Sequence, residues 1–185
     1  FKYANRPKWI IESLLDNIGQ NRIEVDLVHF SGPAFNRVEN RLMNLHLIRA
    51  WLTRAVLFNT DGESIVPRDT LYKRPVMVMR GSFKPPTKVH LDMIQCATPQ
   101  FLEAQGVSEE QLVLLTEITM SELISGDSVG DSDFLARVDL LNQLGATVLV
   151  SDYLRYFRLR SWLRRYTQNP IGIVISVRDF DYLFD

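Results

Sequence analysis

The sequence is short of cysteine, of net charge and of long hydrophobic runs. Cys96 is the single cysteine among 185 residues, so no internal disulfide can form and we expect a reducing, cytoplasmic location. The 21 Lys and Arg against 22 Asp and Glu leave a formal net charge of −1, which gives no general attraction to polyanions and argues against nucleic acid as the main partner. No apolar stretch approaches the roughly 20 residues that cross a bilayer, so we expect no membrane partner.

The apolar content is sufficient for one packed domain. Hydrophobic residues make up 46% of the chain, which is enough to bury a sizeable core over residues 1–185. The sequence begins with Phe1 rather than methionine, and residues 178–185 end where the pattern predicts the start of a new helix. We therefore expect a single α/β domain that is a fragment or a trimmed part of a longer chain.

Segments with helix-like and strand-like apolar patterns alternate along the chain. The strand-like runs are short and continuously apolar, and each is followed by a helix or by a segment long enough to form one. We predict strands at 22–30, 55–58, 75–79, 112–120, 146–151 and 171–177, and helices at 6–21, 40–54, 88–106, 134–145 and 153–167. Pro99 is expected to disturb or split the helix at 88–106, because proline removes a helical hydrogen bond.

The continuous apolar character of the strands indicates how the sheet is covered. Strands buried on both sides read as unbroken Val, Ile and Leu runs, which is typical of a mostly parallel sheet covered by helices on both faces. We predict an open, Rossmann-like α/β sheet, and part of a (β/α)8 barrel is the alternative. Both architectures bind ligands at the carboxyl ends of their strands.

Polar residues follow the predicted strands at those ends. Glu117 interrupts an apolar strand, where a carboxylate has to be paired, bind a metal or face a cleft, because burying it alone is costly. It is therefore our candidate metal ligand. Asp152 either contacts a cofactor or caps the next helix. The full set is Ser31, Gly32, Asn36, Asn59, Thr60, Asp61, Arg80, Gly81, Ser82, Thr87, Glu117, Thr119, Ser151, Asp152, Arg178 and Asp179.

The stretch "RGSFKPPTKVH" at 80–90 combines several features of an anion site. Gly81 lets the backbone turn sharply and approach a ligand without a Cβ in the way. Thr87 can cap the following helix, whose first free amides point at an anion in front of them. His90 lies one turn into that helix, and Arg80 adds a positive charge. The same residues also suit a purely structural turn, in which Thr87 caps and His90 packs.

At these positions the stretch resembles the HxGH-type nucleotidylyltransferases, whose signature is G-[ST]-F-x-P-x-[HT]-x-G-H. The matching residues are Gly81, Ser82, Phe83, Pro85, Thr87 and His90. The resemblance implies that Thr87 and His90 contact the triphosphate of a nucleotide and stabilise charge as pyrophosphate leaves, with Gly81 and Ser82 close to the phosphates. It also implies Mg²⁺ bound with a nucleoside triphosphate. The longer patterns at 134–153 and 165–175 look like bacterial cytosolic proteins described as nicotinate-nucleotide adenylyltransferases.

Two classes of function remain open from the sequence. The first is an enzyme that acts on a phosphorylated or nucleotide ligand, most concretely by nucleotidyl (adenylyl) transfer to a phosphorylated small molecule. The second is a non-catalytic α/β binding or assembly module, a possible homo-oligomer, in which the 80–90 loop is only structural. The arginines Arg158, Arg160, Arg164 and Arg165 lie outside the apolar arc of their predicted helix. They are interpreted as a solvent face with stem packing or ion pairs.

Overall fold

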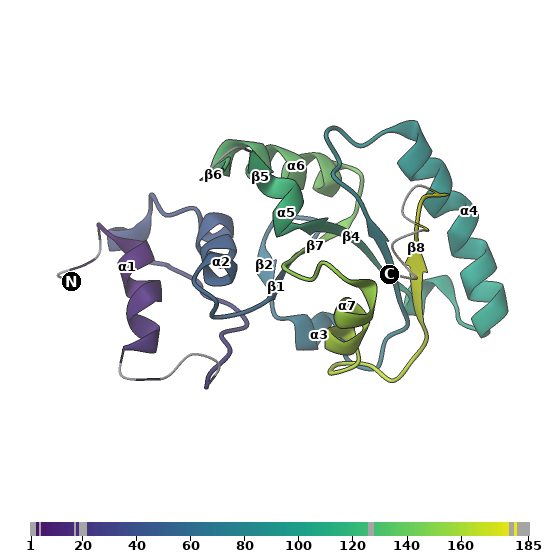
Figure 1. The fold of residues 1–185 in the computed structure, drawn as a ribbon, viewed down its shortest axis with the longest axis horizontal. Coiled ribbons are helices and arrows are strands. Elements are labelled where there is room, and N and C mark those ends of the chain that lie inside the picture. The colour runs from purple at the N-terminus through teal and green to yellow at the C-terminus, as the bar shows by residue number, and fades with distance from the viewer. Residues whose placement is uncertain are drawn as a thin grey trace.

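The computed structural model describes residues 3, 5–16, 18, 22–125, 128–177 and 180, and these form an open sheet with helices on both sides (Figure 1). Its six strands run in the order β2-β1-β7-β4-β3-β8. They are β1 (Ala55–Phe58), β2 (Ser64–Ile65), β3 (Val76–Arg80), β4 (Val113–Thr119), β7 (Thr147–Ser151) and β8 (Ile171–Val174). The strands β5 (Ile124–Ser125) and β6 (Ser128–Val129) form a separate two-stranded antiparallel sheet.

The strands are mostly parallel. β3 pairs in parallel with both β4 and β8, and β4 pairs in parallel with β7. β1 is antiparallel to both β7 and β2. The prediction of a mostly parallel α/β sheet is confirmed, and this mixed sheet is compatible with a Rossmann-like fold. The order is linear and β2 does not pair with β8, so the described residues form no barrel.

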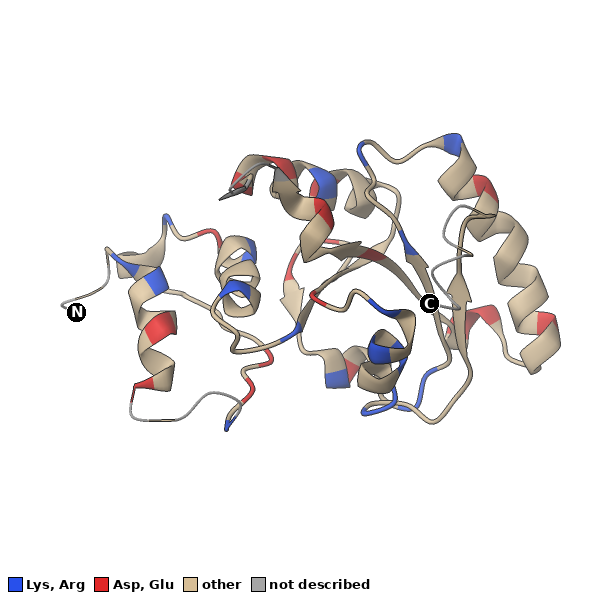
Figure 2. Cartoon of the chain, in the orientation of Figure 1, with Lys and Arg blue, Asp and Glu red and all other residues tan. Residues whose placement is uncertain are grey.

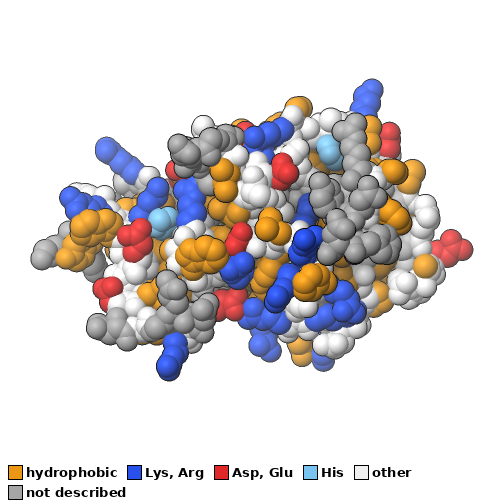
Figure 3. Space-filling view, viewed as in Figure 1, with side chains coloured by type: hydrophobic (Ala, Val, Ile, Leu, Met, Phe, Trp, Pro, Cys, Tyr) orange, Lys and Arg blue, Asp and Glu red, His pale blue; other side chains and the backbone are white. Residues whose placement is uncertain are grey.

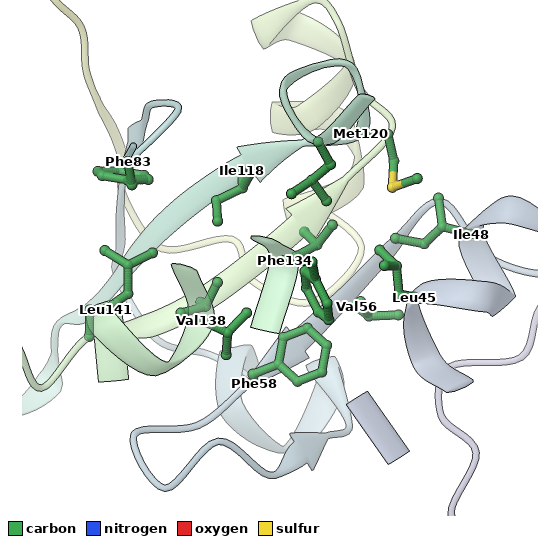
Figure 4. Packing of buried hydrophobic residues seen from close by; sticks show 14 of the residues in the cluster. Leu45, Ile48, Val56, Phe58, Phe83, Ile118, Met120, Phe134, Val138 and Leu141 are labelled. Atoms are coloured by element: carbon green, nitrogen blue, oxygen red, sulfur yellow. The ribbon is translucent and has the colours of Figure 1, made fainter. Parts of the chain in front are cut away.

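Helices cover both faces of the sheet because the strands present apolar side chains on both. One face carries α2 (Asn40–Arg49), α4 (Lys88–Gln105) and α6 (Asp131–Gln143), and the other carries α3 (Pro67–Leu71) and α7 (Tyr156–Leu163). In the core of the first face, the rings of Phe58 and Phe134 meet edge to face at 5.7 Å, beside Val138 (Figure 4). The short elements are α1 (Pro7–Glu12), α5 (Met120–Leu123) and the 3₁₀ turns Ser13–Leu15, Pro33–Phe35 and Glu109–Gln111.

The strand predicted at 22–30 is wrong, because this segment forms no strand of the sheet. Its backbone pairs with side chains of α2 instead of a strand. The Asn44 amide accepts from the Val28 N–H at 3.1 Å and donates to the Val28 carbonyl at 2.8 Å. Asn40 makes the same pair of bonds with Phe30, at 2.7 and 3.1 Å. A side-chain amide has the donor and acceptor of a peptide group, so two asparagines one helical turn apart replace a neighbouring strand.

We expect Asn44→Ala to lower the free energy of unfolding by about 1–3 kcal/mol, because it leaves backbone groups of Val28 unsatisfied in a partly buried site. Asn44 itself is 1% exposed. Urea denaturation measures the loss. Asn36→Ala, at an exposed asparagine, is the matched control and should change stability by no more than about 0.5 kcal/mol. Equal effects of the two substitutions would contradict this role of Asn44.

Other predicted boundaries differ in ways that local geometry explains. Helix α4 runs through Pro99, so of the two expected effects of this proline, a disturbed or a split helix, the split is wrong. Gln95, whose carbonyl loses its helical donor to the proline, is exposed, and water can therefore satisfy it. The helix predicted to reach residue 54 ends at Arg49, and Trp51 there has a positive φ of 60°. No helix in the described part of the chain combines the length and apolar character that crossing a bilayer requires.

Candidate functional site

An open cleft of about 1210 Å³ lies at the carboxyl ends of β3, β4 and β8. The chain runs from β3 to β4 to β7 in one direction across the sheet, then returns past β3 to form β8. In α/β sheets of this kind, ligands bind in the crevice where the strand order reverses. The residues that line the cleft are Met79, Arg80, Gly81, Ser82, Val89, His90, Met93, Thr119, Ser121, Glu122, Leu154, Arg155, Tyr156, Ile175, Ser176 and Val177.

The loop between β3 and α4 is held firmly on one wall of this cleft. The Gly81 amide donates to the Glu117 carbonyl at 3.0 Å, and the Arg137 guanidinium donates to the Ser82 carbonyl at 3.0 Å. Phe83 turns inward and is 1% exposed. A Cβ at Gly81 would stand 3.1 Å from the Phe83 ring, so any other residue here would press against this ring. The loop is therefore anchored to the fold at Gly81, Ser82 and Phe83.

Thr87 and His90 interact directly with each other. Thr87 is the N-cap of α4 and forms a capping box with His90. The Thr87 N–H donates to His90 Nδ1 at 3.0 Å, so the neutral imidazole carries its proton on Nε2. His90 is half-buried, packs on the Phe83 ring at 5.1 Å between centroids and lines the cleft. Thr87 is exposed and is not among the lining residues, so His90 is the member of the pair that faces the cleft.

Arg80 and Glu117 form a buried ion pair at the end of the sheet. They are register partners on β3 and β4, which brings the side chains together. Arg80 Nε and Nη2 donate to the two Glu117 oxygens at 2.8 and 3.0 Å, and Ser151 Oγ donates to Glu117 Oε1 at 2.5 Å. Glu117 is 0% exposed. Of the three states expected for this carboxylate, it adopts the paired one, and both of its oxygens are engaged.

The remaining Arg80 donors connect the ion pair to the segment after β7. Arg80 donates to the Tyr153 and Leu154 carbonyls, each at 2.8 Å. Its guanidinium lies 4.4 Å from the centre of the Tyr156 ring. Burial raises the pKa of the neighbouring Tyr153 phenol, so this hydroxyl stays neutral at physiological pH. The pair thus ties three strands to the cleft wall that Leu154 and Tyr156 form.

Several predicted site residues lie away from the cleft. Asp152 forms an ion pair with Arg54 at 3.0 Å and does not cap α7, whose N-cap is Arg155. Residues 59–61 follow β1, which is antiparallel to its neighbour β7. They therefore lie at the opposite end of the strands from the cleft. Residues 31–36 follow the segment 22–30, which lies outside the sheet. The predicted Arg178 and Asp179 fall outside the described residues.

Two important arginines did not emerge as site residues from the sequence. Arg137 is 2% exposed and donates to the Ser82 and Glu122 carbonyls as well as to Asp133. Burial lowers the pKa of its guanidinium from the ordinary value. Its position three residues after Phe134 and four before Leu141, on the apolar arc of α6, was the signal that could have identified it. Arg155 at the start of α7 lines the cleft, and no sequence pattern distinguished it from the other arginines nearby.

Lys and Arg residues are frequent along α3 and α7 (Figure 2), and positive side chains gather on the same part of the surface (Figure 3). Arg164 donates to the Asn169 carbonyl at 2.6 Å and Arg165 pairs with Glu24 at 2.5 Å, whereas Arg158 and Arg160 are exposed.

No group of three or more His, Cys, Asp or Glu in the described ranges could hold a metal ion.

Similarity to known proteins does not identify the site. No family model matches the chain, and neither a curated protein nor a solved structure matches it. The geometry and chemistry of the cleft are what bear on function.

Proposed function

We propose that this protein binds a nucleotide or another phosphorylated ligand in the cleft and transfers a nucleotidyl (adenylyl) group to a phosphorylated small molecule. The observation that carries the proposal is the position of the 80–90 loop. Gly81, Ser82 and His90 line a cleft at the reversal point of a sheet whose order suits a Rossmann-like fold. Along the chain, β3 is the first of the parallel strands β3, β4, β7 and β8. In the HxGH-type family the motif also follows the first strand.

The residues at the start of α4 have suitable chemistry for a phosphate. Intrahelical bonding there begins with the His90 and Leu91 amides, which donate to the Thr87 carbonyl, so the amides of Lys88 and Val89 precede it. Such amides at a helix N-terminus favour anions. The Nε2–H of His90 is a donor for a phosphate oxygen as charge develops on it. Val89 stands where the family has glycine and is 63% exposed, so its side chain narrows the approach to these amides.

In the proposed reaction, a phosphate oxygen of the acceptor attacks the α-phosphorus of the nucleoside triphosphate, and pyrophosphate leaves. The protein contributes positioning and charge stabilisation and forms no covalent intermediate. Mg²⁺ in proteins is commonly held by one or two carboxylates together with substrate phosphates. Since the described residues form no group of three or more potential metal ligands, Mg²⁺ would be held mainly by the phosphates of the nucleotide, and the residues of the cleft would bind and orient those phosphates.

Binding is tested first by the thermal stability of the protein with ATP and Mg²⁺. A ligand at 100 times its dissociation constant adds about 2.7 kcal/mol to the stability of the folded state. His90→Gln then separates the two roles of the histidine. Glutamine at this position can still accept from the Thr87 N–H in a capping box, but it has no imidazole. We expect it to keep the melting temperature and to lower the rate of pyrophosphate release about 10²–10³-fold.

The alternative function is a non-catalytic α/β binding or assembly module. It is favoured by the mutual engagement of Thr87 and His90 in the cap and by the exposure of Thr87 outside the cleft. If ATP with Mg²⁺ leaves the melting temperature unchanged and His90→Gln behaves like the wild type in every assay, this second reading replaces the enzyme.

A further inference from the structure

Two guanidinium groups line the cleft within the described chain, and one of them is already engaged. A guanidinium has five N–H donors. Arg80 uses four of them, two for Glu117 and two for the carbonyls of Tyr153 and Leu154. Its charge is balanced by the fully buried Glu117 carboxylate, and its side chain is only 13% exposed. Arg80 therefore supports the cleft wall and has little capacity left for a ligand.

Arg155 is in the opposite situation. It lines the cleft and is exposed, and its guanidinium makes no hydrogen bond or ion pair with any residue that the structure describes. Its backbone is nevertheless fixed. The Arg155 carbonyl accepts from the Arg158 and Leu159 amides at 3.1 and 3.3 Å, and the two preceding carbonyls are held by Arg80. A cation with free donors on a rigid backbone is well suited to meet an anion.

Arg155 and His90 approach the cleft from opposite faces of the sheet. His90 belongs to α4, which packs on the same face as α6, whereas Arg155 precedes α7, whose Leu159 and Trp162 pack on the other face. Because the two donors stand on opposite walls of the cleft, a ligand that engages both has to extend across it.

We infer that Arg155, and not Arg80, is the cation that receives the anionic part of the ligand, and that the ligand carries at least two linked phosphoryl groups spanning from His90 to Arg155. This inference rests on the proposed function, because it assumes that the cleft binds a phosphorylated ligand. It narrows that ligand to a diphosphate, a triphosphate or a nucleotide that contains one.

The experiment compares Arg155→Gln with Arg158→Gln by isothermal titration calorimetry. Both substitutions remove one positive charge from an exposed arginine near the start of α7, but only Arg155 lines the cleft. The probes are inorganic pyrophosphate, orthophosphate and ATP with Mg²⁺. We expect Arg155→Gln to weaken pyrophosphate and ATP at least tenfold and Arg158→Gln to weaken them less than twofold. The wild type should bind pyrophosphate more tightly than orthophosphate, and melting temperatures should be equal in all three proteins.

Each other outcome decides between the inference and the proposed function. Equal losses in the two variants, or no loss in Arg155→Gln, overturn the assignment of Arg155 while ATP binding by the wild type still supports the nucleotide proposal. Binding of pyrophosphate but not ATP, with the tenfold loss in Arg155→Gln, supports Arg155 and overturns the nucleotide proposal. Orthophosphate bound as tightly as pyrophosphate overturns the two-phosphoryl ligand. A wild type that binds none of the probes overturns both the inference and the function.

Discussion

Arg80→Met is expected to lower the free energy of unfolding by about 3–5 kcal/mol, because removing one partner of a buried ion pair leaves the other charge without compensation. Glu117 is 0% exposed and accepts two hydrogen bonds from Arg80. Ser151 donates to one of its oxygens, which is too little to stabilise an isolated buried carboxylate. The loss is measured by urea denaturation at neutral pH.

Two further variants make the Arg80 prediction specific. Arg158→Met removes an exposed arginine of the same size and should change stability by no more than about 0.5 kcal/mol. In Arg80→Met/Glu117→Leu the whole pair becomes apolar, and such replacements are often neutral or stabilising. The double variant should therefore recover most of the stability that the single variant loses. A double variant as unstable as Arg80→Met would show that packing of the arginine stem, rather than the charge of Glu117, is responsible.

Phe83→Ala is expected to cost about 3–5 kcal/mol of stability, the usual range for a buried phenylalanine. Phe83 is 1% exposed within the core that includes Met79 and Ile118. It also has a positive φ of 47°, a conformation that costs a residue with a side chain about 1–2 kcal/mol. Burying the ring contributes about 1.5–3 kcal/mol before any cavity cost, so packing outweighs the backbone strain.

The strain and the packing at Phe83 are separated by two other substitutions. Phe83→Leu keeps most of the buried volume and should lose less than Phe83→Ala. Phe83→Gly removes the ring but also the strain, so it should be no less stable than the alanine variant. All three are compared by thermal and urea unfolding. A glycine variant clearly less stable than the alanine variant would contradict the view that the backbone is strained here.

Both positions also support the candidate site. The Phe83 ring packs on the imidazole of His90, and Arg80 holds the carbonyls that precede Arg155. Loss of either support should therefore weaken ligand binding even where the protein still folds. Stability and the geometry of the cleft are therefore linked, because Phe83 and Arg80 hold in place the residues that are proposed to contact the ligand, His90 and Arg155.

Much of the layered architecture could be read from local pattern. The apolar runs that became β1, β3, β4 and β7 are continuous because these strands are buried on both faces of the sheet, whereas β8, at the edge of the sheet, is half-buried. The glycine–serine turn after β3 and the threonine cap of α4 were recognisable because caps and turns depend on residues close in sequence. These features also located the loop that carries His90. The apolar pattern and the backbone preferences of neighbouring residues are local properties, so they can be read from the amino-acid sequence.

The choice of partners was decided by tertiary contacts. Residues 22–30 have the composition of a strand, but α2 presents Asn40 and Asn44 at the spacing that satisfies their backbone instead. The sequence indicated Arg80 because it follows a strand, whereas nothing in the sequence distinguished Arg155 from the arginines near it. Only the folded sheet sets Arg80 beside Glu117 and leaves Arg155 facing the cleft. The type of a side chain indicates which hydrogen bonds and ion pairs it can form. The topology of the chain determines which groups come close enough to form them. For residues far apart in the sequence, no short stretch of sequence contains this information.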